Sequence, residues 1–347
     1  MTAKVAKVAK VAIVEMDKNA KIYVAGHRGM VGSALVRKLA ERGYENLVTR
    51  THAELDLLDQ SAVHAFMAHE KPEYVFLAAA KVGGIQANNV SRADFIYQNL
   101  VIEANVIHAA HAADVQRMLF LGSSCIYPRD CPQPIKEEYL LTGPLEPTNE
   151  PYAIAKIAGI KLCESFNRQY GRHYVSAMPT NLYGPNDNYD LNTSHVLPAL
   201  LRKAHEAKRR GDHVMELWGS GRPRREFMHV DDMADACVFL MEQLDITDGL
   251  FNVGTGTDVT IEELARRIMD VIGFEGSLAF DPSKPDGTQR KLLDVGMLQR
   301  LGWSASIPLD AGIAQAYRSF LETPVGSVKQ EIPANADYVR NELHSAH

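Results

Sequence analysis

Two residues four positions apart, Tyr152 and Lys156, offer proton-transfer chemistry in this sequence of 347 residues. Side chains at that spacing share one face of a helix, and an ammonium group beside a phenol lowers the phenol pKa from about 10. Such a tyrosine could exchange a proton with a carbonyl oxygen. Upstream, Ser123 follows the predicted strand that ends at Leu121, where α/β sheets place catalytic groups. The sequence therefore suggests a site of Ser123, Tyr152 and Lys156, although a serine there could simply form a turn.

A glycine-rich turn opens the globular part of the sequence. Gly26, Gly29 and Gly32 follow a short apolar strand at 21–25 and precede a helix predicted over 33–42. In this context the glycines allow a tight turn and let a pyrophosphate approach bare backbone at a helix N-terminus. A glycine-rich turn between strand and helix can also be purely structural. The predicted dinucleotide site comprises Gly26, His27, Arg28, Gly29, Met30, Val31 and Gly32.

The residues after the second predicted strand indicate which dinucleotide fits. An NAD site usually carries an acidic residue there for the ribose hydroxyls, whereas this chain has Arg50 and His52. Together with Arg28, these residues could meet a 2′-phosphate, so the sequence favours NADP. Arg50 could also be a solvated surface residue. At the adenine end, the predicted contacts are Asp56 and Leu57.

The elements that must hold these residues alternate regularly along the chain. Apolar runs typical of buried strands occur at 21–25, 47–49, 74–78, 118–121 and 174–178, with helical patterns between them. Such alternation predicts a parallel sheet covered on both faces. The predicted fold class is α/β, a Rossmann-like doubly wound parallel sheet with a smaller, mostly C-terminal substrate-binding lobe.

The same pattern divides the chain, because strict alternation stops after residue 185. We expect a disordered N-terminal extension, a cofactor-binding domain in two segments, a substrate lobe in two segments and a C-terminal tail. The predicted bounds are 1–20 for the extension, 21–185 and about 226–255 for the cofactor domain, 186–225 and about 256–325 for the lobe, and 326–347 for the tail.

Composition excludes several classes of protein. Lys and Arg number 37 against 43 Asp and Glu, a net charge of −6 without a long basic run, so no nucleic-acid partner is expected. No apolar run approaches the roughly 20 residues that span a bilayer, so no membrane association is expected. The four cysteines lack C-x-x-C spacing and are too sparse for a disulfide scaffold. We therefore expect no metal site and a cytoplasmic location.

These motifs occur together in a known superfamily. The glycine loop, Ser123 and Tyr152-x-x-x-Lys156 resemble the extended short-chain dehydrogenase/reductases, which act largely on nucleotide sugars. Longer segments are similar to the GDP-L-fucose synthase family, a resemblance that spans residues 21–320. Those segments are Gly26-His27-Arg28-Gly29-Met30-Val31-Gly32-Ser33, Ala80-Lys81-Val82-Gly83-Gly84-Ile85, Gly122-Ser123-Ser124-Cys125-Ile126-Tyr127-Pro128, and the runs at 146–152 and 179–185.

The resemblance implies a bifunctional reaction on GDP-4-keto-6-deoxy-D-mannose: epimerisation at C3 and C5, then NADPH-dependent reduction of the C4 ketone to GDP-L-fucose. Cys125 and His195 match the family's two proton carriers. Their ordinary pKa values, about 8.5 and about 6.5, lie on either side of neutrality, and which is acid and which is base stays open. In the reduction Tyr152 would protonate the C4 oxygen, Ser123 would hydrogen-bond it, and Lys156 would hold the phenol and the nicotinamide ribose.

The resemblance also implies the remaining contacts. The cofactor would be lined by Leu121, Gly122, Ser123, Ser124, Lys156, Pro179, Thr180, Asn181, Leu182 and His195. The GDP-sugar would contact Asn181, Lys203, Trp218, Arg225, Asp286 and Lys291. The family can carry an arginine where this chain has His52. Extended reductases commonly form homodimers through two long helices, predicted here at 93–113 and 152–170.

Two other interpretations stay open. A simple 4-ketoreductase acting on the same substrate would not need both Cys125 and His195. A cofactor-sensing binding module on this fold would not need Ser123, Tyr152 and Lys156 together. The residue set therefore favours the epimerase and reductase, with the reductase alone as the alternative.

Overall fold

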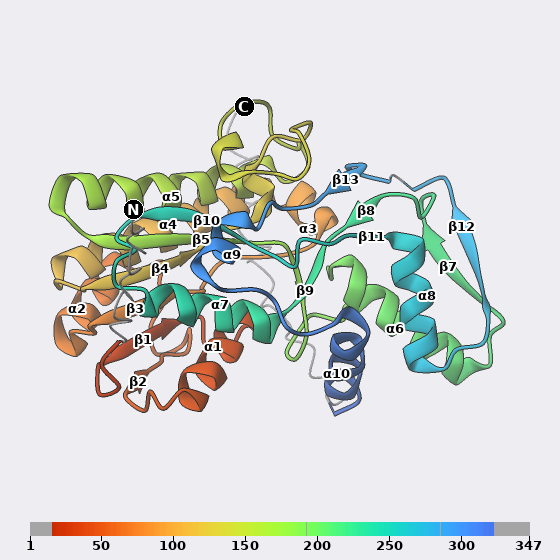
Figure 1. Ribbon diagram of the computed structural model, residues 1–347, viewed down its shortest axis with the longest axis horizontal. Coiled ribbons are helices and arrows are strands. Elements are labelled where there is room, and N and C mark those ends of the chain that lie inside the picture. Colours follow the sequence, from red (N-terminus) through yellow and green to blue (C-terminus); the bar gives the residue numbers. More distant parts are fainter. Residues whose placement is uncertain (1–15, 192, 285, 323–347) are drawn as a thin grey trace, which may run out of the picture.

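A parallel sheet of six strands forms the larger part of the computed structural model, which describes residues 16–191, 193–284 and 286–322 (Figure 1). The strand order is β10-β5-β4-β3-β1-β2, and every neighbouring pair is parallel. This confirms the predicted α/β fold class. The strands are β1 (Ile22–Ala25), β2 (Leu47–Val48), β3 (Tyr74–Leu77), β4 (Arg117–Leu121), β5 (His173–Pro179) and β10 (Gly249–Val253).

Helices cover both faces of this sheet because its strands are apolar on both sides. In β1, Ile22 and Val24 face one core, whereas Tyr23 and Ala25 face the other. The first core lies under α1 (Met30–Glu41) and α7 (Val230–Glu242), and the second lies under α2 (Gln60–Glu70), α4 (Arg92–Ala112) and α5 (Glu150–Tyr170). Figure 1 shows α4 and α5 side by side along one face of the sheet.

A smaller part on the right of Figure 1 has its own core. Leu201, Leu264, Ile268 and Ile313 pack together where three helices meet a pair of parallel strands. The helices are α6 (Val196–Arg210), α8 (Ile261–Ile272) and α10 (Leu309–Glu322), and the strands are β7 (Val214–Trp218) and β12 (Ser277–Asp281). This part is built from chain that precedes and follows α7.

Short elements connect the two parts. Strands β6 (Asn181–Tyr183) and β9 (Phe227–His229) pair in parallel, and β8 (Arg224–Arg225) lies between β11 (Val259–Thr260) and β13 (Arg290–Lys291). The remaining short helices are α3 (Ile85–Val90), α9 (Gly296–Leu301) and the 3-10 turns η1 (Ser124–Ile126) and η2 (Glu137–Tyr139).

One predicted boundary is corrected at the N-terminus. The expectation of a disordered extension over 1–20 is wrong for residues 16–20, because Met16 and Ala20 are each 1% exposed and pack in the core with Leu35 and Leu39. The rest of that extension lies outside the described residues, as does the predicted tail at 326–347. Among the helices of the described chain, none is both long and apolar enough to cross a membrane.

Candidate active site

The glycines of the loop between β1 and α1 are needed for different reasons: two for packing of the fold and one for approach of a ligand. Gly26 has φ +82°, and a Cβ there would lie 2.7 Å from the Ala79 nitrogen. A Cβ at Gly32 would lie 2.1 Å from the Gly26 carbonyl oxygen. The fold itself therefore requires these two glycines. Gly29 is exposed, and a Cβ there would meet only the Gly26 oxygen, at 3.3 Å.

The N-terminus of α1 fits an anionic group. Gly29 is its N-cap residue, and no side chain caps the helix there. A helix N-terminus presents unpaired backbone N–H groups and the positive end of the helix dipole. A pyrophosphate could therefore approach the bare backbone of Gly29, which explains the third glycine of the motif.

The guanidinium of Arg50, two residues after β2, already forms hydrogen bonds within the protein. Its Nη2 donates to Glu70 Oε1 across 2.6 Å and its Nη1 to the Thr49 carbonyl across 2.8 Å. The group also lies 5.2 Å from the centre of the Phe66 ring. The side chain is thus held in place, and a 2′-phosphate would have to share it with Glu70.

Arg28 and His52 are the more accessible basic side chains at this end. Arg28 is exposed, and the His52 side chain is 78% exposed, 3.7 Å from the Asp56 carboxylate. Hydrogen bonds from Thr51 lower the pKa of Glu54, and the charges of Arg50 and Arg28 lower it further. Arg28 and Arg50 therefore both lie within electrostatic reach of Glu54.

The turn after β4 meets the second turn of α5. Ser123 caps η1, and its Oγ accepts a hydrogen bond from the Cys125 N–H across 3.4 Å. The Lys156 ammonium donates to the carbonyl oxygen of Leu121 across 2.9 Å. The structure therefore brings the lysine of the Tyr-Lys pair to the end of the strand that carries the serine, as parallel α/β sheets arrange their sites.

The phenol of Tyr152 differs from the sequence-based expectation. Burial raises its pKa, and the nearby Cys125 and Glu103 raise it further. The sequence predicted a lowered pKa because of Lys156, but a buried carboxylate offsets the lysine charge: Glu103 Oε1 lies 3.0 Å from Lys156 Nζ. Tyr152 therefore stays a phenol at neutral pH, which is the form that can donate a proton.

The charge of Lys291 acts on both Cys125 and His195, the two proposed proton carriers of epimerisation. Burial raises the pKa of the Cys125 thiol and lowers that of the His195 imidazole, and the Lys291 ammonium lowers both. In turn, burial lowers the pKa of Lys291 and the Cys125 thiol opposes this. Cys125 and His195 thus lie within electrostatic reach of one cation. At neutral pH they are a thiol and a neutral imidazole.

The loop that carries His195 is fixed by a residue that the sequence did not single out for this purpose. The Gly84 N–H donates to the Thr193 carbonyl across 2.9 Å, and a Cβ at Gly84 would lie 2.8 Å from the Ser194 oxygen. Only glycine allows this approach, after which His195 begins α6 as its N-cap residue. The family segment around Gly84 thus has a structural purpose beside the site.

The candidate GDP contacts fall into two groups. Arg225 on β8 lies opposite Lys291 on β13 in the parallel pair. Because Lys291 is within electrostatic reach of Cys125, this strand pair places a predicted nucleotide contact near the proposed proton carrier. Trp218 is 56% exposed, and the Nζ atoms of Lys203 and Lys284 lie 4.8 and 5.4 Å from its ring centre. Lys284 was not predicted.

Asp286 has a partner within the protein. Its carboxylate accepts hydrogen bonds from the Ser220 N–H across 2.7 Å and from the Ser220 hydroxyl across 2.8 Å. The charge of Asp286 also opposes the effect of burial, which lowers the pKa of Arg225. Asp286 therefore shapes the turn that holds Ser220, beside Arg225.

The residues after β5 are held by one backbone carbonyl. Thr180 Oγ1 and Asn181 Nδ2 donate to the Glu226 carbonyl oxygen across 3.2 and 2.8 Å. Pro179 ends β5, and Asn181 and Leu182 belong to β6. This segment lies at the carboxyl edge of the sheet, the same edge as Ser123, where a nicotinamide would be expected.

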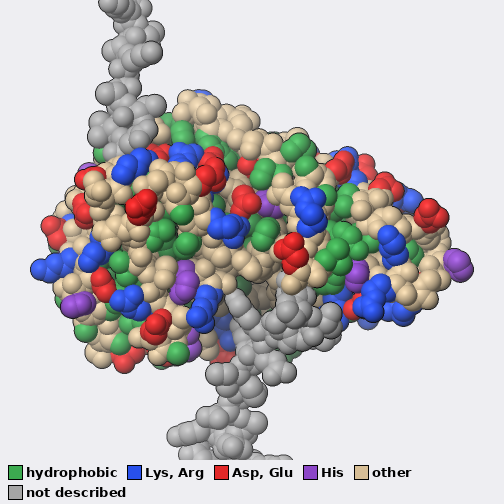
Figure 2. All heavy atoms as spheres, turned by 90° about the horizontal axis from the view of Figure 1, so that it is seen from below, with side chains coloured by type: hydrophobic (Ala, Val, Ile, Leu, Met, Phe, Trp, Pro, Cys, Tyr) green, Lys and Arg blue, Asp and Glu red, His purple; other side chains and the backbone are tan. Residues whose placement is uncertain are grey.

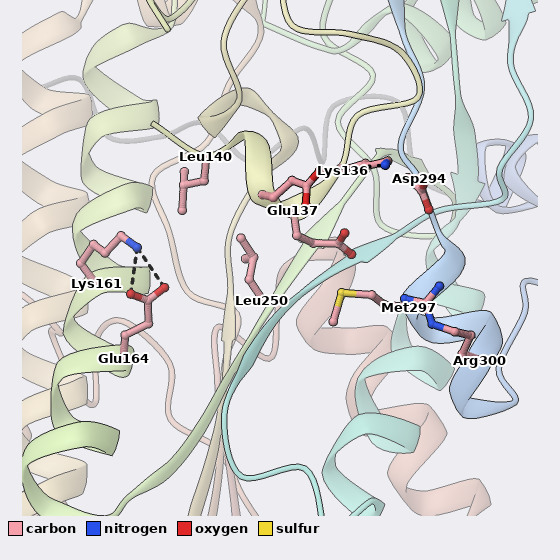
Figure 3. Close-up of a pocket in the computed structure, with 10 residues that line it drawn as sticks. Lys136, Glu137, Leu140, Lys161, Glu164, Leu250, Asp294, Met297 and Arg300 are labelled. Atoms are coloured by element: carbon pink, nitrogen blue, oxygen red, sulfur yellow. Dashed lines mark hydrogen bonds and ion pairs between the residues drawn. The ribbon is translucent and has the colours of Figure 1, made fainter. Parts of the chain in front are cut away.

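Two cavities among the described residues differ in whether they contain a predicted site residue. One of 660 Å³ is lined by Glu137, Lys161, Glu164, Met297 and Arg300 among others, and contains none of the predicted site residues (Figure 3). The dashed lines there mark the ion pair of Lys161 with Glu164, 2.8 Å long. A second cavity, of 270 Å³, is lined by Arg225, Thr255 and Ser306 among others, and therefore adjoins the nucleotide candidates.

The charged side chains on one face of the molecule and the possible metal ligands bear on the expectations from the sequence. Figure 2 shows acidic and basic side chains interspersed on one face, without a broad patch of a single sign. Within residues 16–191, 193–284 and 286–322, no group of three or more His, Cys, Asp and Glu side chains could hold a metal ion.

Comparison with known proteins places this geometry in a family. The model of the NAD dependent epimerase/dehydratase family matches residues 22–254. The GDP-L-fucose synthase of Escherichia coli (strain K12) is 60% identical over 310 residues, which cover 87% of this chain and 97% of that protein.

Two solved structures are also similar. A GDP-6-OMe-4-keto-L-xylo-heptose reductase from C. jejuni has a TM-score of 0.83 and 41% identity, covering 89% of this chain and 99% of that chain. A GDP-L-fucose synthetase from Naegleria fowleri bound to NADP has a TM-score of 0.82 and 28% identity, covering 89% of this chain and 95% of that one.

Proposed function

The chain belongs to the NAD dependent epimerase/dehydratase family, and we infer that it converts GDP-4-keto-6-deoxy-D-mannose to GDP-L-fucose with NADPH as reductant. The observation that carries this inference is the position of Lys291. It lies within electrostatic reach of both Cys125 and His195, next to the turn that holds Ser123. Groups suited to proton abstraction and groups suited to ketone reduction therefore share one site.

Epimerisation requires two proton carriers. The C4 ketone acidifies the protons on C3 and C5, because the negative charge left by their removal is delocalised onto the ketone oxygen. Cys125 and His195 would remove and return protons on opposite faces of the sugar ring, which inverts each centre. By lowering the pKa of Cys125, Lys291 makes the thiolate easier to form at neutral pH.

Reduction requires a proton donor at the C4 oxygen. NADPH, when bound, supplies the hydride for C4. Tyr152 would donate its phenol proton to the oxygen, since burial keeps that proton in place at neutral pH. Ser123 would hydrogen-bond the same oxygen, and Lys156 would orient the phenol and the nicotinamide ribose.

The residues present fit NADP. The uncapped N-terminus of α1 and the bare Gly29 backbone suit a pyrophosphate. Arg28, with Arg50 also within electrostatic reach of Glu54, suits a 2′-phosphate, and no acidic residue occupies the position after β2 that NAD sites use. The segment from Pro179 to Leu182 would line the nicotinamide end.

We assign the GDP-sugar to the smaller part of the molecule. The proposed cofactor domain comprises 21–185 and about 226–255, and the proposed substrate lobe comprises 186–225 and about 256–325. Arg225 and Lys291 would meet the diphosphate, and Trp218, flanked by Lys203, offers an exposed aromatic face for the base.

The proposed assembly is a homodimer in the cytoplasm. Helices α4 and α5 pack side by side, and their outer surfaces expose Tyr97 (65%) and Ile154 (42%). These apolar side chains support a dimer through this helix pair. None of the four cysteines, all within the described residues, forms a disulfide, which agrees with a reducing compartment.

A reductase without epimerase activity is the second candidate, since a heptose reductase shares 41% identity with this chain. The experiment that separates the two is identification of the product formed from GDP-4-keto-6-deoxy-D-mannose and NADPH. GDP-L-fucose supports the proposed function, whereas a 4-reduced sugar with unchanged C3 and C5 supports the second candidate.

A further inference from the structure

Glu103 is a buried carboxylate without a role in the reaction described above. It lies in the middle of α4 and is 1% exposed, and its Oε1 atom lies 3.0 Å from the Nζ atom of Lys156, which is 2% exposed. Apart from this ion pair, neither carboxylate oxygen has a hydrogen-bonding partner among the described residues. A buried charge is costly without a partner, so the position of Glu103 depends on Lys156.

Another buried carboxylate shows the contrast. Glu226 is 0% exposed, and its side chain accepts hydrogen bonds from the N–H groups of Thr255, Gly256 and Leu293. Those bonds fix two backbone segments, which is a structural role. The carboxylate of Glu103 contacts no such backbone donor, and its one charged partner among the described residues is Lys156, a residue of the proposed reductase site.

The neighbouring elements make room for this ion pair. A Cβ at Gly159 on α5 would lie 2.7 Å from Glu103 Oε2 and 2.4 Å from the Phe120 ring. Glycine weakens a helix interior, so its presence here has a packing reason. The Phe120 ring centre lies 4.8 Å from Lys156 Nζ. Glu103, Phe120 and Gly159 together form what we call the lysine socket.

We propose that Glu103 is a positioning residue for the reduction: it holds the Lys156 ammonium from the α4 side and balances its charge beside Tyr152. This inference rests on the proposed function, because it concerns the reductase half of the site. Glu103 touches neither substrate nor cofactor, and acts through Lys156 and the charge it places beside Tyr152.

The charges around the socket give the direction of the effect. Tyr152 faces Cys125, Lys156 and Glu103, and Glu103 also faces Cys163. Burial raises the pKa of Glu103, and the Lys156 ammonium opposes this. The ion pair of the two side chains has no net charge. Removing the carboxylate leaves a buried positive charge, so the Tyr152 phenol loses its proton at lower pH. Loss of that proton stops the reduction.

Glu103→Gln tests this directly in the pH dependence of kcat/KM for NADPH oxidation by GDP-4-keto-6-deoxy-D-mannose. We expect the alkaline limb to move down by about one pH unit or more, the shift typical of a charge at this distance. Solvent exchange at C3 and C5 without NADPH should stay within about twofold of wild type, because Cys125 and His195 carry it. Equal losses in both reactions, or an unchanged limb, would overturn the proposal.

Two further variants test whether the effect depends on the charge and on the position of the carboxylate. Glu103→Asp retains the charge and should restore the wild-type alkaline limb. Glu242→Gln is the matched control, since Glu242 is also buried and ion-paired, with Arg42 Nη1 at 2.5 Å, on the other face of the sheet. Its pH profile should equal that of wild type. A shift as large as that of Glu103→Gln would show that any buried carboxylate has this effect.

Thermal unfolding of the protein alone gives a readout without activity. In folded Glu103→Gln, Tyr152 releases its proton at lower pH than in folded wild type, so folding becomes more favourable relative to wild type as pH rises. The deficit in Tm relative to wild type should therefore shrink in alkaline solution. For Glu242→Gln it should stay constant, because Arg42 keeps its proton. If wild type oxidises no NADPH, the proposed function fails, while a deficit independent of pH contradicts the role of Glu103.

Discussion

The Ser123 hydroxyl accepts a hydrogen bond from the backbone N–H of Cys125 across 3.4 Å. One turn after β4 therefore carries a residue of each proposed half reaction. The hydroxyl belongs to the reduction of the C4 ketone, and the thiol belongs to epimerisation beside it. Because the two groups are held by the same turn, the sugar could pass from one reaction to the other without leaving the site.

Tyr152→Phe should separate the two reactions. The variant lacks the phenol proton, so we expect the rate of reduction to fall by at least about 100-fold, the usual contribution of a general acid. Proton exchange at C3 and C5 should persist, because Cys125 and His195 are retained. NADPH oxidation and exchange into deuterated water measure the two rates. Reduction at the wild-type rate would remove Tyr152 from its proposed role.

Lys291→Gln should impair epimerisation through the thiol. Burial raises the pKa of Cys125 and Lys291 opposes this, so loss of the cation raises the pKa further and leaves less thiolate at neutral pH. We expect exchange at saturating substrate to fall by about tenfold at pH 7 and to recover at higher pH. Lys291→Arg, which keeps the charge, is the control. A fall that does not recover at higher pH would argue against an electrostatic role.

Substitutions in the glycine loop should have two distinct effects. Gly32→Ala places a Cβ 2.1 Å from the Gly26 oxygen and should prevent stable folding. Gly29→Ala places its Cβ 3.3 Å from that oxygen, so the variant should fold with a near wild-type Tm but bind NADPH weakly. Thermal unfolding and NADPH fluorescence test the pair. Normal NADPH affinity in Gly29→Ala would mean that the pyrophosphate does not approach this residue.

Arg28→Ala should reduce the preference for NADPH. A charged hydrogen bond to phosphate contributes roughly 1.5–3 kcal/mol, so kcat/KM with NADPH should fall by about 10- to 100-fold. The value with NADH should change little, because NADH lacks the 2′-phosphate. If both cofactors lose equally, Arg28 supports the loop rather than the phosphate, and Arg50 would be the next residue to test despite its bond to Glu70.

Local signals predicted the parallel sheet and its α/β fold class. Apolar runs, the three glycines and the spacing of Tyr152 and Lys156 all depend on residues near in sequence, and each of the six sheet strands is short and buried or half-buried. The predicted disordered extension, 1–20, wrongly included residues 16–20, which are part of the folded protein. Met16 and Ala20 sit in a polar sequence, and only the tertiary packing reveals that they are buried.

Long-range partners could not be predicted in the same way. Nothing near Glu103 indicates that α4 brings it to Lys156. Burial of the phenol, together with Cys125 and Glu103, raises the pKa of Tyr152 instead of lowering it as expected. Likewise, the bond from Arg50 to Glu70 depends on how α2 packs beside β2. The position of Lys291 beside Cys125 depends on the pairing of β13 with β8. Charges that meet only through packing decide the electrostatics of this site.

Proton exchange by the wild-type protein shows whether it epimerises the sugar. Incubation with GDP-4-keto-6-deoxy-D-mannose in deuterated water without NADPH, followed by mass and NMR analysis of the sugar, reports abstraction at each carbon. We predict deuterium at both C3 and C5, and its loss at both positions in Cys125→Ser. Absence of deuterium from both positions with the wild-type protein would contradict the epimerase claim.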